Sequence, residues 1–308
     1  MISILMATYN GERFIHEQID SLLDQTYQDF KLYISDDAST DKTFQIISRY
    51  AKDNPNKIFV SQREKNSGDA KFNFIDMMLE HRDDYLMLCD QDDVWFKDKI
   101  EITLSKMKEM ELMYGIGTPI LVHTDLEVVD NNLKTISPSF KEAMNADYTK
   151  TELRNQVIQN TLTGCTAMYN RALADLIKIE PRYMVIHDWW LILIASAFGK
   201  IGSDERQTVL YRQHNKNEIG AKDVRTMRYK LDRALHYRKV KKAINITYQQ
   251  ADSFLRTYFE MLSTDQRKLL AAYSDIPNHF KFIRIYRIFS LGTHKNGFSR
   301  RVAHIIFI

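Results

Sequence analysis

The chain has 308 residues, 44% of them hydrophobic and 27% charged, which is the balance of a globular protein that can bury a full core. No apolar run approaches the length of a bilayer-spanning helix, and Met1 leads directly into a strand and a motif, with no visible signal peptide. The sequence therefore excludes a membrane-spanning chain and predicts a soluble or peripheral protein. Cys89 and Cys165 lie in apolar segments, which indicates reduced thiols and a cytoplasmic setting.

The net charge of +3 is distributed unevenly. Residues 1–220 hold 25 Lys and Arg against 34 Asp and Glu, whereas residues 221–308 hold 18 against 6. This asymmetry predicts an acidic catalytic domain over 1–220 and a basic helical extension over 221–308.

Four β–α units follow one another from the N-terminus. Short apolar segments at 2–6, 32–34, 58–60 and 85–89 predict buried strands, and apolar residues at helical spacing follow each of the first three. This alternation predicts an α/β fold with a mainly parallel, Rossmann-like sheet and helices on both of its faces.

Polar motifs end all four strands. In such sheets ligands bind beyond the carboxyl ends of the strands, so the motifs predict one site. Neither GxGxxG nor GxxxxGK[ST] is present, which excludes a dinucleotide fingerprint and a P-loop. Carboxylates at positions 36 and 37 can accept hydrogen bonds from a base or a ribose. The residues predicted to line this nucleotide site are Thr8, Tyr9, Asn10, Asp36, Asp37, Asn66, Gly68, Asp90 and Gln91.

The fourth strand runs into three carboxylates, Asp90, Asp92 and Asp93. Their mutual repulsion favours a bound cation, and hard oxygen ligands suit Mg²⁺ or Mn²⁺. Because carboxylates and phosphates repel each other, this group can reach a nucleotide diphosphate only through such a cation. A solvated loop is one alternative. Another is a haloacid-dehalogenase-like phosphatase, whose DxDx[TV] motif fits residues 90–94, although there the motif normally follows the first strand.

Together the motifs ATYNG, SDDASTDKT, NSG and DQDDVW resemble the family 2 glycosyltransferases with a GT-A fold. The later HDWW and YRQHNKN segments are most similar to the bacterial rhamnosyltransferase branch, which builds capsules and cell-wall polysaccharides. The resemblance implies that Thr8 and Asp37 contact the nucleoside of a nucleotide sugar. It also implies that Asp90 and Asp92 form the metal-binding DxD, with Asp92 the more direct ligand.

Further elements are predicted between residues 97 and 168. Helical spacing indicates an amphipathic helix at 97–113, and apolar runs predict strands at 119–122 and 161–168. Residues 134–150 lose periodicity and predict a mobile loop over the acceptor. In the resembling family the last of these strands borders the acceptor, which implies an acceptor-side position for Gly164.

Asp188 begins an apolar helix and has two interpretations. An aspartate at a helix start is commonly an N-cap. The resemblance instead implies that Asp188 is the catalytic base of an inverting enzyme, since a sugar hydroxyl must lose its proton as the new bond forms. Trp189 and Trp190 can raise its basicity, stack on an acceptor sugar or fill the core.

A strand at 209–214 carries two further candidates. Arg212 can offset the charge of a departing diphosphate. His214 is either structural or, as in related enzymes, part of the metal or diphosphate site. Residues 215–220 are expected to form a flexible loop that orders over the nucleotide.

Two basic amphipathic segments, 222–242 and 280–308, predict contact with an anionic membrane surface. Packing in a homodimer is the alternative. Nucleic acid is not expected as a partner, because no recognition module accompanies the charge.

The combined interpretation is a metal-dependent, inverting glycosyltransferase at the inner face of the cell membrane. Its expected donor is dTDP-L-rhamnose and its expected acceptor is a saccharide hydroxyl of a growing, lipid-linked polysaccharide. The alternatives are a UDP-hexose transferase of the same fold and a non-catalytic nucleotide-sugar-binding partner.

Overall fold

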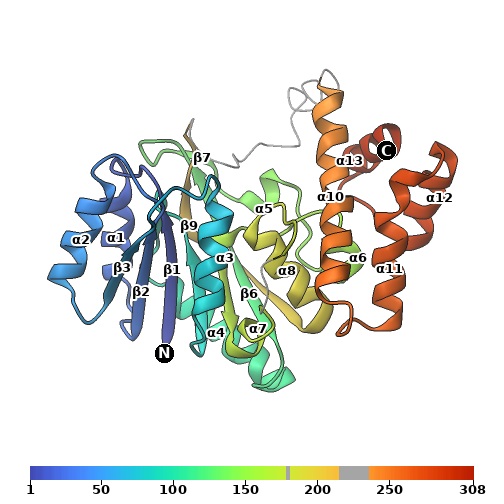
Figure 1. Ribbon diagram of the computed structural model, residues 1–308. Coiled ribbons are helices and arrows are strands. Elements are labelled where there is room, and N and C mark those ends of the chain that lie inside the picture. Colours follow the sequence, from blue (N-terminus) through green and yellow to red (C-terminus); the bar gives the residue numbers. More distant parts are fainter. Residues whose placement is uncertain (178–180, 215–235) are drawn as a thin grey trace. The chain divides into compact units, whose positions relative to one another are not determined.

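The computed structural model describes residues 1–177, 181–214 and 236–308 (Figure 1). The predicted loop at 215–220 and most of the basic segment at 222–242 lie outside these residues. The chain divides into two compact units, a sheet unit and a helical unit. The sheet unit comprises Met1–Phe140, Leu162–Glu180 and Gly199–Gly220, and the helical unit comprises Lys141–Thr161, Pro181–Phe198 and Ala221–Ile308. The predicted extension at 221–308 thus falls in a unit that also includes two earlier segments.

The first half of the sheet unit is parallel, as predicted. Strand β1 (Ile2–Thr8) pairs with β2 (Phe30–Asp36) on one side and with β4 (Tyr85–Cys89) on the other, and β3 (Ile58–Gln62) extends β2. Every residue of β1 is buried, which explains why its sequence is apolar apart from Ser3 and Thr8. The connecting helices are α1 (Ile15–Leu23), α2 (Thr43–Asp53) and α3 (Ala70–Glu80).

The second half of the sheet is mixed. Strand β8 (Ala167–Asn170) is antiparallel to both β4 and β6 (Ile120–Val129). Strand β9 (Lys200–Arg212) runs parallel to β6, and the short β5 (Val94–Trp95) pairs antiparallel with β9. Along the sheet the order is β3-β2-β1-β4-β8-β6-β9-β5, with β7 (Thr135–Ser137) on β6. Helix α4 (Lys99–Tyr114) confirms the predicted amphipathic helix. Cys89 and Cys165 are buried free thiols, as predicted.

Two expectations for this half were wrong, and two predicted strands exist with different bounds. The predicted loop at 134–150 contains β7 and the short helix α5 (Phe140–Ala143), because β7 pairs with β6 through contacts distant from any local periodicity. The predicted strand at 161–168 begins as a 3-10 turn, η1 (Gly164–Thr166), before β8. The strand predicted at 119–122 continues to Val129, and the one predicted at 209–214 ends at Arg212.

The helical unit is built around apolar helices. Its described helices are α6 (Leu153–Gln156), α8 (His187–Phe198), α10 (Tyr237–Thr257), α11 (Thr264–Ser274), η2 (Ile276–Asn278), α12 (Lys281–Leu291) and α13 (Phe298–Phe307), while the short α7 (Arg171–Ala174) belongs to the sheet unit. Trp190 of α8 packs edge-on against Phe254 of α10, with ring centroids 5.2 Å apart. Ser263 and Gln266 form a capping box that starts α11. Among the described helices, none combines the length and apolarity that crossing a bilayer requires.

Candidate nucleotide-sugar site

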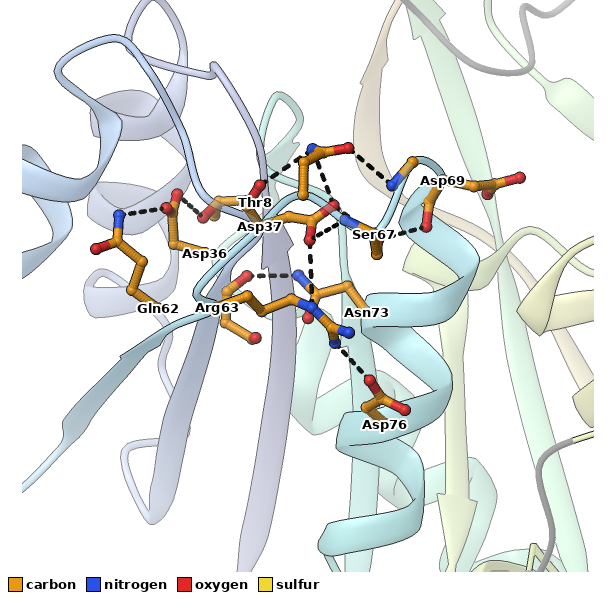
Figure 2. Close-up of polar contacts among 12 residues, drawn as sticks. Thr8, Asp36, Asp37, Gln62, Arg63, Ser67, Asp69, Asn73 and Asp76 are labelled. Carbon is orange, nitrogen blue, oxygen red and sulfur yellow. Dashed lines mark hydrogen bonds and ion pairs between the residues drawn. The ribbon is translucent and has the colours of Figure 1, made fainter.

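Asp36 ties the ends of β1, β2 and β3 together. It is fully buried and accepts hydrogen bonds from Thr8 Oγ1 (3.0 Å) and from Gln62 Nε2 (3.1 Å) (Figure 2). It also accepts from the backbone N–H (2.9 Å) and the hydroxyl (2.6 Å) of Ser39. These bonds occupy both carboxylate oxygens. Asp36 therefore holds the strand ends in place, and its oxygens are already occupied by protein donors.

Asp37 holds the loop that follows β3. Its carboxylate accepts from the backbone N–H (2.9 Å) and hydroxyl (2.7 Å) of Ser67 and from Asn66 Nδ2 (3.1 Å), and the Arg63 guanidinium lies 3.4 Å away (Figure 2). Asn66 in turn accepts from the backbone N–H of Gly68, which adopts a positive φ of 87°. Three residues predicted to line the site, Asp37, Asn66 and Gly68, are thereby brought together.

Gln91 joins the ends of β1 and β4. Its side-chain amide accepts from the backbone N–H of Tyr9 (2.9 Å) and donates to the Tyr9 carbonyl (3.0 Å). Asn10 follows in a left-handed conformation, with φ of 48°, and its Oδ1 accepts from the backbone N–H of Thr40. The Tyr9 side chain itself remains 44% exposed, so it is available to a ligand.

This joint explains why position 11 is glycine. A Cβ on Gly11 would lie 2.2 Å from Oε1 of Gln91, so an alanine there must displace the amide that binds Tyr9. We expect Gly11→Ala and Gln91→Ala each to raise the donor KM several-fold, and the double variant to be no worse than the more impaired single variant. Steady-state kinetics of all three enzymes, with an exposed-site control such as Lys52→Ala, measures this coupling. Fully additive effects on the free energy derived from the donor KM would show that the two residues act independently.

Asp93 is a buried carboxyl behind the DxD pair. It is fully buried, and its Oδ1 accepts from the backbone N–H of Arg212 (3.0 Å). Burial raises the pKa of Asp93 well above its usual range, and the charges of Asp92 and Asp90 act in the same direction. Three carboxyl groups are therefore crowded here, as the sequence predicted, and the innermost one is the hardest to ionise.

A possible ligand set surrounds this carboxyl. Oxygens of Asp90 and Asp93 and the sulfur of Cys165 all lie within 4.8 Å of one another. Burial, together with Asp93 and Asp90, raises the pKa of the Cys165 thiol, so the sulfur stays protonated at neutral pH. A protonated thiol is a poor ligand for hard cations, which leaves the carboxylates as the groups that fit Mg²⁺ or Mn²⁺.

Asp92 and His214 form a contact pair. His214 Nε2 lies 2.7 Å from Asp92 Oδ2, and the imidazole stacks on Phe14 with ring centroids 5.1 Å apart. The predicted metal residues Asp92 and His214 are thus adjacent, and the ring holds the carboxylate in one orientation.

Arg212 is more enclosed than its predicted role implies. It is 1% exposed, and its guanidinium donates to the carbonyls of Asp92 (2.8 Å) and Asn131 (2.7 Å) and pairs with Glu17. The guanidinium also lies 4.6 Å from the Phe14 ring centroid. These contacts indicate that Arg212 braces the segment that carries the carboxylates, while direct diphosphate binding stays a prediction.

Lys99 was not predicted as part of the site. Its ammonium is fully buried, donates to Thr208 Oγ1 (3.3 Å) and lies 4.6 Å from the Trp95 ring centroid. Burial lowers the pKa of Lys99 to about 8, against the opposing influence of Cys165, Cys89 and Asp93. The alternating charges of 97–113 are typical of a surface helix, so the sequence pattern gave no indication that Lys99 is buried.

Asp188 lies in the first turn of α8 in the helical unit and is 7% exposed. Its Oδ1 accepts from Asn160 Nδ2 at 3.0 Å. Trp189 donates its indole N–H to the carbonyl of Gln156 (2.7 Å), which fixes the orientation of its ring. Trp190 is fully buried, which favours its core-filling alternative over sugar stacking. Gly164 lies in η1 of the sheet unit, directly before Cys165.

Comparisons with known proteins identify the family of this chain. The model of the family "Glycosyl transferase family 2" matches residues 3–177. The dTDP-rhamnosyl transferase RfbG of Shigella flexneri is 30% identical over 250 residues, which cover 76% of this chain and 81% of that protein.

Two solved structures share the fold. Staphylococcus aureus TarS 1–349 in complex with UDP-GlcNAc superposes with a TM-score of 0.57 at 14% identity, over 99% of this chain and 89% of that one. The mannosyltransferase PcManGT from Pyrobaculum calidifontis, in complex with GDP-Man and Mn²⁺, has a TM-score of 0.54 at 14% identity, over 93% and 84%. From its matched residues and its fold, this chain belongs to glycosyl transferase family 2 and has the GT-A architecture.

Proposed function

We propose that this glycosyltransferase transfers L-rhamnose from dTDP-rhamnose, with inversion, to a hydroxyl of a growing, lipid-linked polysaccharide. The observation that carries the donor assignment is the 30% identity to the dTDP-rhamnosyl transferase RfbG over 76% of the chain. The polar ends of β1 to β4 support a nucleotide-sugar site of the predicted composition.

The nucleoside side of the site is preorganised. Because Asp36 and Asp37 already accept several protein hydrogen bonds, their main role in this proposal is to fix the loops that contact base and ribose. Thr8 is part of the same network, while the exposed Tyr9 ring offers a direct contact surface to the donor.

The diphosphate side fits a divalent cation. Asp90 and Asp92 would hold Mn²⁺ or Mg²⁺, His214 would orient Asp92, and Asp93 would support the pair from below. The crowding of carboxyl groups is the observation that favours a bound ion, because a cation would offset their mutual repulsion. A cation at this position offsets negative charge on the leaving nucleoside diphosphate.

Asp188 is the proposed base. A carboxylate oxygen of Asp188 takes the proton of the acceptor hydroxyl. At the same time the acceptor oxygen bonds to the anomeric carbon, and the bond from that carbon to the diphosphate oxygen breaks. The contact from Asn160 supports this role, because it holds the carboxylate in one orientation, and the low exposure of Asp188 (7%) keeps it in a largely dry environment.

Release of nucleoside diphosphate tests the proposal. Purified protein is incubated with Mn²⁺ or Mg²⁺, a membrane glycolipid extract and separate dTDP-, UDP- and GDP-sugars. We expect release from dTDP-rhamnose alone and its abolition by a chelator. Release from a UDP-sugar would keep the reaction class and overturn the donor, whereas silence with every donor that binds would favour a non-catalytic nucleotide-sugar-binding partner.

A further inference from the structure

Helix α12 exposes an aromatic face to solvent. Phe282 is 87% exposed, Tyr286 72% and Phe289 52%, and these positions fall on one side of the helix. Phe280, which immediately precedes the helix, is 85% exposed. We call these four residues, together with Ile283, the aromatic face of α12. Large aromatic side chains gathered in this way on a helix surface mark an interaction site more often than isolated exposed residues do.

The opposite side of α12 is anchored to the protein. Ile288 is 1% exposed. Arg284 donates to the carbonyls of His279 (2.6 Å) and Pro277 (2.7 Å), and Arg287 pairs with Asp275 at 2.8 Å. These contacts fix the rotation of the helix, so the outward position of the aromatic face is built into the fold and does not result from a loosely attached helix.

Helix α13 extends the same surface. Lys281 donates through Nζ to the carbonyl of Ile306 at 3.0 Å, which ties the start of α12 to the end of α13. Ile306 is itself 52% exposed and Val302 38% exposed. The apolar surface thus continues from one short helix to the next within the helical unit.

The C-terminal segment that carries this surface is basic. From residue 276 to residue 308 the sequence contains six Lys and Arg and no Asp or Glu. Aromatic side chains beside cations, on helices too short to cross a bilayer, are the composition of a segment that lies in the plane of an anionic lipid surface.

We propose that the aromatic face of α12, with the exposed end of α13, docks the protein on an anionic lipid bilayer. The rings would enter the headgroup region, where aromatic residues are favoured, and the exposed cations Lys281 and Arg301 would contact acidic headgroups. A second copy of the chain is a poorer occupant. A two-fold interface brings the same patch of both copies together, and here it would oppose two basic segments that contain no Asp or Glu from residue 276 to residue 308.

Vesicle flotation of the full chain tests this docking, without donor or acceptor. We expect the protein to float with vesicles that contain phosphatidylglycerol, to remain behind with phosphatidylcholine alone, and to detach at high salt. The double variant Phe282→Ser/Phe289→Ser should lower the partition coefficient by about tenfold or more. Leu112→Ser/Met113→Ser, which removes exposed apolar side chains beside Glu109 and Glu111, is the matched control and should float like the wild type.

Other results would overturn the proposal. Equal flotation of the α12 variant and the wild type would remove the aromatic face from membrane binding, as would failure of the wild type to float. A wild-type dimer in light scattering that becomes monomeric in the variant, without flotation, would assign the face to a second copy. Because all substituted side chains are exposed, circular dichroism should show an unchanged fold, and nucleoside diphosphate release in detergent tests the transferase separately.

Discussion

Asp188→Asn is expected to abolish most sugar transfer while leaving donor binding intact. A positioned general base contributes about 10²–10⁴-fold to a rate, and an asparagine cannot take the acceptor proton. The change keeps the volume of the side chain and retains a carbonyl oxygen that can accept from Asn160 Nδ2, so the start of α8 should fold as before. Single-turnover transfer with saturating donor measures the loss, and calorimetry measures donor affinity.

Two comparisons make the Asp188 result specific. Asp252→Asn changes a partly exposed acid of the same unit and should have no effect on transfer. Asn160→Ala removes the contact that orients Asp188, and we expect a smaller reduction than for Asp188→Asn. Asp188→Asn with unimpaired turnover would return the residue to a purely structural role at the helix start.

Asp92→Asn is expected to lower Mn²⁺ affinity by about tenfold to a hundredfold, and to lower donor affinity as well. Neutralising Asp92 removes one of the carboxylates proposed to hold the ion and also alters the contact with His214. Titration of Mn²⁺ followed by its electron paramagnetic resonance signal measures the change directly. Transfer by the variant should be partly restored at higher Mn²⁺ concentration.

Neighbouring residues supply the controls for this experiment. Asp98→Asn replaces an exposed acid near the site and should leave Mn²⁺ affinity unchanged. His214→Ala should weaken Mn²⁺ binding less than Asp92→Asn, because the ring acts through Asp92. If Asp92→Asn binds Mn²⁺ as tightly as the wild type, the ion site does not include Asp92.

The parallel half of the fold could be predicted because its signals are local. Strand β1 is buried along its whole length, so its sequence is apolar apart from Ser3 and Thr8, and Asn10 and Gly11 indicate the turn after it. The same applies to β4, where an apolar run stops at the carboxylates. In each case a few adjacent residues carry both the element and its end.

The remainder depends on pairing between distant segments. Strand β7 is stabilised by its pairing with β6, and its three residues have no periodic pattern from which a strand could be predicted. The burial of Lys99 depends on Thr208, more than a hundred residues away in sequence. Likewise, Arg212 is enclosed by Glu17 and Asn131, which no spacing near residue 212 indicates. Long-range contacts of this kind assign roles that residue type alone leaves open.

The Gln91 joint between β1 and β4 has a thermodynamic consequence. The Gln91 side chain binds the Tyr9 backbone at the nucleoside side, and Gln91 itself lies between Asp90 and Asp92 in the sequence. If ion binding tightens this joint, the ion increases nucleotide affinity, and reciprocity then requires the nucleotide to increase ion affinity by the same factor. The free enzyme would thus release its ion readily and retain it only while a nucleotide is bound.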